Sequence, residues 1–263
     1  MIYHCDMLLS TNKGDETLNG KVVLVTGGGR GIGAETARIL AARGAAVVIN
    51  YVSNSEAANS LVHELTKQGS QALAVQADVR DEAQVKHLVN ATVKAFGHID
   101  ALVSNAAMSF VRKPFLEMNW FEFSQKLNDE LKAAFALSQA VLPHMIQNHY
   151  GRIVYVSTEL ANHPQVPFIA HGTAKAGLST FGRYIAKEFG PHGITANVVS
   201  PGLVDTERTR FQPEEFKKRM ANMTPLGRIA TPEDIARVIA FYTSDDSQFV
   251  TGFNVSVDGG LSI

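Results

Sequence analysis

The chain has 263 residues, a formal net charge of −1 at pH 7, and a composition that is 45% hydrophobic and 19% charged. It is long enough to bury a substantial apolar core, and a charge so close to zero gives no reason to expect nucleic acid or an anionic membrane as the main partner. With one cysteine, Cys5, no internal disulfide is possible, which fits a reducing compartment. No apolar run approaches the roughly 18 residues of a membrane span. We expect a cytoplasmic protein without a membrane partner.

Strand-like and helix-like segments alternate along the chain, as in a parallel sheet covered on both faces by helices. The first strand, 22–25, is wholly apolar, as expected for a strand buried on both sides. Apolar residues at helical spacing follow over 32–43, where Gly44 ends the helix. The remaining predicted strands are 46–49, 72–75, 101–103, 153–156, 196–199 and 255–257, and the remaining helices are 56–68, 82–96, 120–148 and 173–189.

This alternation predicts an α/β fold: a single-domain, Rossmann-type, doubly wound parallel sheet over residues 18–263. No repeat or interdomain linker interrupts it. Residues 1–17 carry several charges and no long apolar centre, so we expect a flexible N-terminal tail and not a signal peptide.

A glycine-rich turn follows the first strand and opens the first helix, with the sequence Thr-Gly-Gly-Gly-Arg-Gly-Ile-Gly over 26–33. Glycines there let the backbone approach a pyrophosphate at the positive end of the helix. A glycine cluster alone can be an ordinary turn, but its place between a buried strand and a helix favours a dinucleotide site.

Further motifs follow later strands: Asp78-Val79 after the third, Asn105-Ala106 after the fourth, and Pro201-Gly202 with Thr206 after the sixth. With the Thr-Gly-x-x-x-Gly-x-Gly turn, they make residues 18–263 resemble the classical short-chain dehydrogenase/reductase family, most closely its 3-oxoacyl-[acyl-carrier-protein] reductase branch. The ending, 250–260, is similar as well. The family pattern Asn-Asn-Ala-Gly is Ser-Asn-Ala-Ala here, over 104–107.

The resemblance implies a nicotinamide cofactor. The residues expected to hold it are Gly27, Arg30, Gly31, Ile32, Gly33, Asn50, Tyr51, Ser53, Asp78, Val79, Asn105, Ala106, Lys175, Pro201, Gly202, Val204 and Thr206. NAD-specific sites usually carry a carboxylate after the second strand, and residues 50–53 contain none. Arg30 can supply positive charge to a 2′-phosphate, or it can be a solvated turn residue. NADP(H) is therefore favoured over NAD(H).

The catalytic positions depart from the family pattern. The family has a tyrosine four residues before a lysine, a serine thirteen residues before the tyrosine, and an asparagine on the central helix. Lys175 is in place, and counting back from it puts His171 at the tyrosine position and Thr158 at the serine position. The asparagine position falls on Glu130. Enoyl reductases of the wider family place a tyrosine seven residues before the lysine, where this chain has Phe168.

These substitutions leave the proton chemistry open. The Thr158 hydroxyl can still donate to a substrate oxygen. Glu130 can pair with Lys175 or His171, or stay solvated if its helix is shifted. Histidine starts with a pKa of about 6.5, so we expect His171 to titrate near neutrality as a general acid/base tuned by Glu130. The opposite interpretation is that His171 only fills a vacated pocket.

We therefore expect an NADP(H)-dependent oxidoreductase that interconverts a carbonyl and an alcohol on a small-molecule or acyl-thioester substrate, without a metal. The alternatives are a catalytically degenerate nucleotide-binding subunit and a repurposed enzyme with non-redox chemistry. The basic stretch 205–223 resembles a substrate lid and could meet an acyl carrier protein, or it can be a solvated amphipathic helix. Family dimers and tetramers pair the helices predicted at 120–148 and 173–189, which implies a homodimer or homotetramer.

Overall fold

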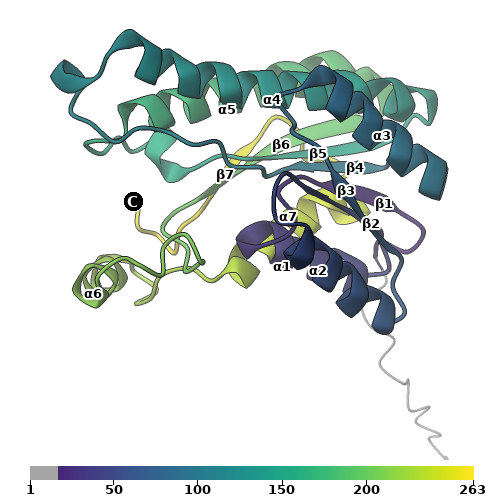
Figure 1. Cartoon of the computed structure of the whole chain (residues 1–263), viewed down its shortest axis with the longest axis horizontal. Helices are drawn as coiled ribbons and strands as arrows, with labels where there is room; N and C mark the ends of the chain where they lie inside the picture. Colours follow the sequence, from purple (N-terminus) through teal and green to yellow (C-terminus); the bar gives the residue numbers. More distant parts are fainter. Residues whose placement is uncertain (1–16) are drawn as a thin grey trace, which may run out of the picture.

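In the computed structural model, which describes residues 17–263, seven parallel strands form one sheet in the order β3-β2-β1-β4-β5-β6-β7 (Figure 1). The strands are β1 Val22–Val25, β2 Ala46–Tyr51, β3 Ala72–Gln76, β4 Ala101–Ser104, β5 Gly151–Val156, β6 Ile194–Pro201 and β7 Asn254–Val257. The strand order reverses direction between β1 and β4, and ligands of open α/β sheets bind at such a switch point. The predicted doubly wound sheet is confirmed. All but the last residue of the tail predicted over 1–17 lies outside the described residues.

The helices form two layers, with α3, α4 and α5 on one face of the sheet and α1, α2 and α7 on the other (Figure 1). Their bounds are α1 Gly31–Ala42, α2 Ser55–Lys67, α3 Glu82–Phe96, α4 Trp120–Gln147, α5 Ile169–Phe189, α6 Glu214–Met223 and α7 Pro232–Thr243. Short 3₁₀ turns occur at Phe115–Glu117, Glu159–Ala161, Gly190–His192 and Asp245–Ser247. Helix α6 stands apart from both layers and has no buried residue, as a solvated amphipathic helix would.

The apolar core is split by the sheet into two clusters. One lies under α3, α4 and α5 and contains Tyr155, which is fully buried and shares a 2.6 Å hydrogen bond with the Ser138 hydroxyl. The other packs β1 and β2 against α1, α2 and α7. Because both faces are covered, the central strands are apolar on both sides, and the polar groups that face a ligand gather at the ends of the strands.

Two helices differ from the sequence-based expectation. Helix α7 was not predicted, although Thr231 and Asp234 form a capping box and Pro232 takes the first position. Helix α5 begins at Ile169 and not at residue 173, so His171 lies within its first turn. His171 and Lys175 are therefore one helical turn apart, on the same side of α5.

Among the described residues, no helix is both long and apolar enough to cross a membrane.

Candidate functional site

The turn between β1 and α1 is built so that two of its positions accept only glycine. A Cβ added to Gly33 would lie 2.3 Å from the carbonyl oxygen of Gly27, and Gly27 itself has a φ of +60°. The side chain of Thr26 ties the turn to the segment after β4, because its Oγ1 accepts hydrogen bonds from the backbone N–H groups of Asn105 (3.0 Å) and Ala106 (3.1 Å). Glycines at these positions let a phosphate group approach the backbone at the start of α1.

The segments predicted to hold a nucleotide converge on this turn. The amide of Asn105 donates to the carbonyl oxygens of Thr26 (3.0 Å) and Gly27 (3.2 Å). A Cβ added to Gly31 would come within 3.5 Å of the Thr206 methyl group, so the segment after β6 lies against the start of α1. That segment, 201–206, is anchored by buried Val204, which bridges to Ala230. The turn therefore has the shape and the neighbours of a dinucleotide site.

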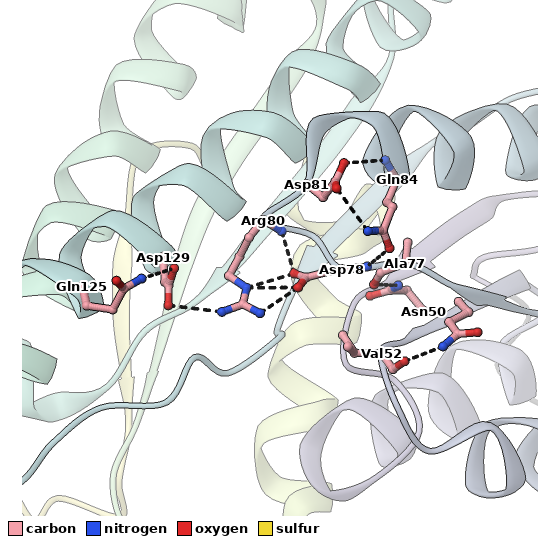
Figure 2. Close-up of polar contacts among 10 residues, drawn as sticks. Asn50, Val52, Ala77, Asp78, Arg80, Asp81, Gln84, Gln125 and Asp129 are labelled. Atoms are coloured by element: carbon pink, nitrogen blue, oxygen red, sulfur yellow. Dashed lines mark hydrogen bonds and ion pairs between the residues drawn. The ribbon is translucent and has the colours of Figure 1, made fainter.

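At the ends of β2 and β3, one predicted contact residue has a framework role. Asn50 is only 1% exposed, and its amide donates to the carbonyl oxygen of Ala77 at 2.9 Å (Figure 2). Its side-chain amide thus ties β2 to the residue after β3. Tyr51 is half-buried, and Ser53 is exposed at the end of the strand.

Asp78, at the end of β3, is held by an arginine that sequence reasoning missed. The Arg80 guanidinium reaches both carboxylate oxygens, at 3.0 and 2.7 Å, and its hydrogen bond lowers the pKa of Asp78. Arg80 also contacts Asp129 on α4, at 3.3 Å (Figure 2). The two-residue spacing of Asp78 and Arg80 is visible in the sequence, but the link to α4 is not. Val79, the next residue, is buried.

A chain of three buried charged groups lies between α4 and α5. The Glu130 carboxylate is 2.6 Å from the Lys175 Nζ and 2.5 Å from the Lys126 Nζ. All three residues are almost fully buried, with exposed fractions of 4, 6 and 1%. Each ammonium also donates to a backbone carbonyl, Lys175 to Val156 (2.6 Å) and Lys126 to Met108 (3.1 Å). Glu130 therefore pairs with Lys175, as one of the predicted alternatives had it, and its helix is not shifted.

Lys126 was missed by the sequence reasoning, although it stands four residues before Glu130, the spacing of a helical ion pair. Its pKa is lowered by burial, which the charge of Glu130 partly offsets. The opposite holds for Glu130, because burial alone would raise its pKa, but the two ammonium groups together bring it below the ordinary value. With two cations and one anion, the cluster carries a net positive charge.

His171 lies beside this cluster as an uncharged ring. Its imidazole stacks on Phe110, with ring centroids 4.3 Å apart and planes 6° from parallel. Its Nδ1 is buried and has no hydrogen-bond partner. Burial, and then the charges of Lys126 and Lys175, lower the pKa of His171 to about 3. The expected titration near neutrality is therefore wrong for this structure. No hydrogen bond joins His171 to Glu130 within residues 17–263, so the expected coupled pair is not formed either.

Thr158 follows β5 and caps the 3₁₀ turn Glu159–Ala161, where its hydroxyl oxygen accepts a hydrogen bond from the Leu160 N–H at 3.4 Å. The hydroxyl proton is left free for another acceptor. Thr158 and Lys175 flank the end of the same strand, because the Lys175 ammonium binds the carbonyl of Val156.

Comparison with known proteins gives the family. A family model described as "Enoyl-(Acyl carrier protein) reductase" matches residues 27–262. A mutant of a Serratia marcescens short-chain dehydrogenase/reductase has a TM-score of 0.87 and 31% identity, covering 94% of this chain and 100% of its own. The chain belongs to the short-chain dehydrogenase/reductase family. A Burkholderia cenocepacia short-chain dehydrogenase solved with NADP is similar too, with a TM-score of 0.85 and 32% identity over 94% of this chain and 100% of its own.

Two curated proteins extend the comparison of this short-chain dehydrogenase/reductase. A hydroxynaphthalene reductase-like protein of Metarhizium robertsii is 36% identical, covering 96% of this chain and 99% of its own. A (2S)-[(R)-hydroxy(phenyl)methyl]succinyl-CoA dehydrogenase subunit of Thauera aromatica is 37% identical, covering 94% and 98%. The likeness runs almost from end to end in both proteins.

Proposed function

We propose that this short-chain dehydrogenase/reductase is an NADP(H)-dependent oxidoreductase that interconverts a carbonyl and an alcohol. The observation that carries the proposal is the turn at Gly27–Gly33, where an added side chain would meet the backbone. The printed names of the relatives, a reductase and a dehydrogenase subunit, support the reaction class. The Burkholderia structure with NADP supports the cofactor.

The chain's own residues fit a nucleotide with an extra phosphate. Arg30 is exposed next to the glycine turn, and no carboxylate follows β2 to repel a 2′-phosphate. The backbone from Gly31 to Gly33 would hold the pyrophosphate, and residues 78–79, 105–106 and 201–206 would border the rest of the nucleotide. When bound, the cofactor supplies the hydride.

For the proton, we propose that Glu130, Thr158, His171 and Lys175 take the four catalytic positions of the family, with His171 where the family has tyrosine. His171 is uncharged at neutral pH. A proton on its buried Nδ1 would have no acceptor, so the tautomer protonated at Nε2 is favoured. In this form His171 donates a hydrogen bond to the substrate oxygen, as Thr158 does. His171 passes its Nε2 proton to that oxygen as the alcohol forms, and its Nδ1 takes up a proton, by way of water, from the ammonium groups that Glu130 joins, so the ring stays neutral.

A second function, a nucleotide-binding subunit without turnover, is favoured by the same low pKa of His171. A group that titrates far from neutrality is a poor general acid/base at physiological pH. In this case His171 packs on Phe110 and does no chemistry.

Partners follow from the family resemblance. We propose that α4 and α5 pair with a second copy in a homodimer or homotetramer, since Phe135 on α4 and Tyr184 on α5 are exposed. The substrate is a small molecule or an acyl thioester. The exposed α6, which carries several basic residues, would meet the acyl carrier protein if the substrate is attached to one.

The test begins with calorimetric titration of NADPH and NADH, followed by cofactor oxidation against β-ketoacyl thioesters and simple ketones. We expect tighter binding of NADPH, turnover in the wild type, and loss of at least 100-fold in kcat for His171→Phe. Full activity in His171→Phe would remove His171 from the mechanism. Binding without turnover, with activity appearing in His171→Tyr, would establish the second function. Failure to bind either nucleotide would overturn the proposal as a whole.

A further inference from the structure

Arg112 is held in one place beside His171 by two aromatic rings. Its guanidinium carbon lies 5.5 Å from the ring centroid of Phe110 and 5.1 Å from that of Phe168. Phe110 in turn stacks on His171 at 4.3 Å. Arginine stacks well on aromatic faces, and the contacts reduce the side-chain entropy that it would lose on binding a ligand. The Phe110 ring thus contacts both this guanidinium and the proposed proton-transfer group.

The Arg112 guanidinium has no anion to pair with. It is exposed, and among residues 17–263 no carboxylate forms an ion pair or hydrogen bond with it. Its five N–H donors are therefore available in the planar fork that matches a carboxylate.

The surroundings of the stack are positive as well. Arg208, from the segment after β6, is another arginine without an ion pair in the described part of the chain. Its pKa is lowered by partial burial and then by the charges of Arg30 and Arg112, so the Arg208 guanidinium lies within electrostatic range of both. Lys126 is 5.6 Å from the Phe110 centroid. Glu130 is the one acid in this group, and it is already shared between two ammonium groups.

A bound NADP(H) would offset part of this charge, because its phosphates would lie at the glycine turn, near Arg30. Arg112, which contacts Phe110 and Phe168 beside His171, would remain without a partner. We propose that Arg112 binds a carboxylate of the substrate, so that this enzyme acts on short hydroxy or oxo acids rather than on neutral alcohols and ketones. The proposal rests on the proposed oxidoreductase function and names its substrate class.

The positions of His171 and Arg112 set the distance between the reacting oxygen and the carboxylate in such a substrate. The reacting oxygen meets His171 and the carboxylate meets Arg112, and both side chains contact the Phe110 ring. Its centroid lies 4.3 Å from that of His171 and 5.5 Å from the Arg112 guanidinium carbon, so a short aliphatic acid can bridge the two groups. The adjacent cavity of about 480 Å³, lined by Phe168, Gly172 and mostly apolar neighbours, is available for an apolar remainder of the substrate.

The experiment uses 3-hydroxybutyrate and its methyl ester, a pair that differs in one charge. Calorimetry on the protein saturated with NADP⁺ gives their affinities, and nucleotide reduction gives kcat/KM. We expect the acid to be preferred over the ester by about 10- to 100-fold, the value of a charge-assisted hydrogen bond. The preference should disappear in Arg112→Gln and be partly kept in Arg112→Lys, which retains the charge but loses the fork.

Arg237→Gln is the control, because Arg237 is an exposed arginine on α7, on the other face of the sheet from α5, where it pairs with Glu233. It should keep the full preference for the acid. Equal affinity for acid and ester in the wild type, or an unchanged preference in Arg112→Gln, overturns the inference. If NADP⁺ does not bind, the oxidoreductase proposal fails, and the acid and ester are then titrated into the protein alone. A preference that depends on Arg112 would still support the carboxylate site.

Discussion

Replacing Glu130 with glutamine should destabilise this protein more than most single substitutions. The change preserves the size of the side chain but removes the carboxylate that lies 2.6 Å from the Lys175 ammonium and 2.5 Å from the Lys126 ammonium. Removing one partner of a buried ion pair costs about 3–5 kcal/mol, because a buried charge is left uncompensated. Here two ammonium groups lose their carboxylate, so we expect the free energy of unfolding at pH 7 to fall by at least about 3 kcal/mol.

The loss of stability in Glu130→Gln should depend on pH and should be smaller in acid than at pH 7. The folded-state pKa of Glu130 is lowered, so its stabilisation is present above the unfolded pKa of about 4.3 and is lost as the pH falls through the folded value. The difference between wild type and Glu130→Gln should therefore narrow in acid. It should also narrow above pH 7, because the unpaired Lys126 of the variant sheds its proton more readily than an exposed lysine does.

The measurement is urea unfolding followed by circular dichroism at pH 4, 7 and 9, at one fixed protein concentration. Lys126→Met and the double variant Glu130→Gln/Lys126→Met complete a double-mutant cycle. In the Glu130→Gln background, removal of the Lys126 charge should restore part of the lost stability. A Glu130→Gln variant within about 0.5 kcal/mol of wild type at pH 7 would refute the reasoning, since that is the usual effect of a surface substitution.

Three further predictions concern single sites. The pKa of His171 is lowered to about 3, so its neutral form is favoured in the folded protein, and the free energy of unfolding of the wild type should rise with pH between about 3 and 6.5. His171→Phe should lack this pH dependence in the same unfolding assay. An equal pH dependence in the two proteins would contradict the effect of burial on the pKa of His171. Gly33→Ala would place a Cβ 2.3 Å from the Gly27 carbonyl oxygen and should weaken NADPH binding by at least about 10-fold in calorimetry, whereas Gly190→Ala, with nothing within 4 Å, should bind normally. Ser53→Asp adds a carboxylate after β2 and should shift the ratio of NADPH to NADH affinity by about 10-fold toward NADH; an unchanged ratio would place the 2′-phosphate elsewhere.

Much of the fold could be predicted because the signals are local. A buried strand between two helices has an apolar run of its own, and every predicted strand is present in the structure, most with one or two residues added at an end. Helix α7 shows the limit. Its capping signals are in the sequence, but its buried residues, Ile235 and Ile239 among them, were not recognised as a helical face.

The candidate site also has a part that could be predicted from the sequence and a part that could not. The family resemblance predicted Glu130, Thr158, His171 and Lys175 as the catalytic positions, because the family pattern has a fixed spacing along the chain. The hydrogen bond from the Asn50 amide to a carbonyl 27 residues away could not be predicted, because no local pattern indicates that contact.

The sequence by itself determined the doubly wound sheet and the glycine turn, and with the family resemblance it predicted which residues stand at the catalytic positions. Only the tertiary structure decided the protonation states and the ion-pair partners of those residues. It brought Lys126 and Lys175 to the same carboxylate, and it surrounded His171 with an aromatic ring and cations, so that the imidazole stays neutral. The physical reason is that a protonation state depends on burial and on charges from other elements, and both arise only when distant segments pack together.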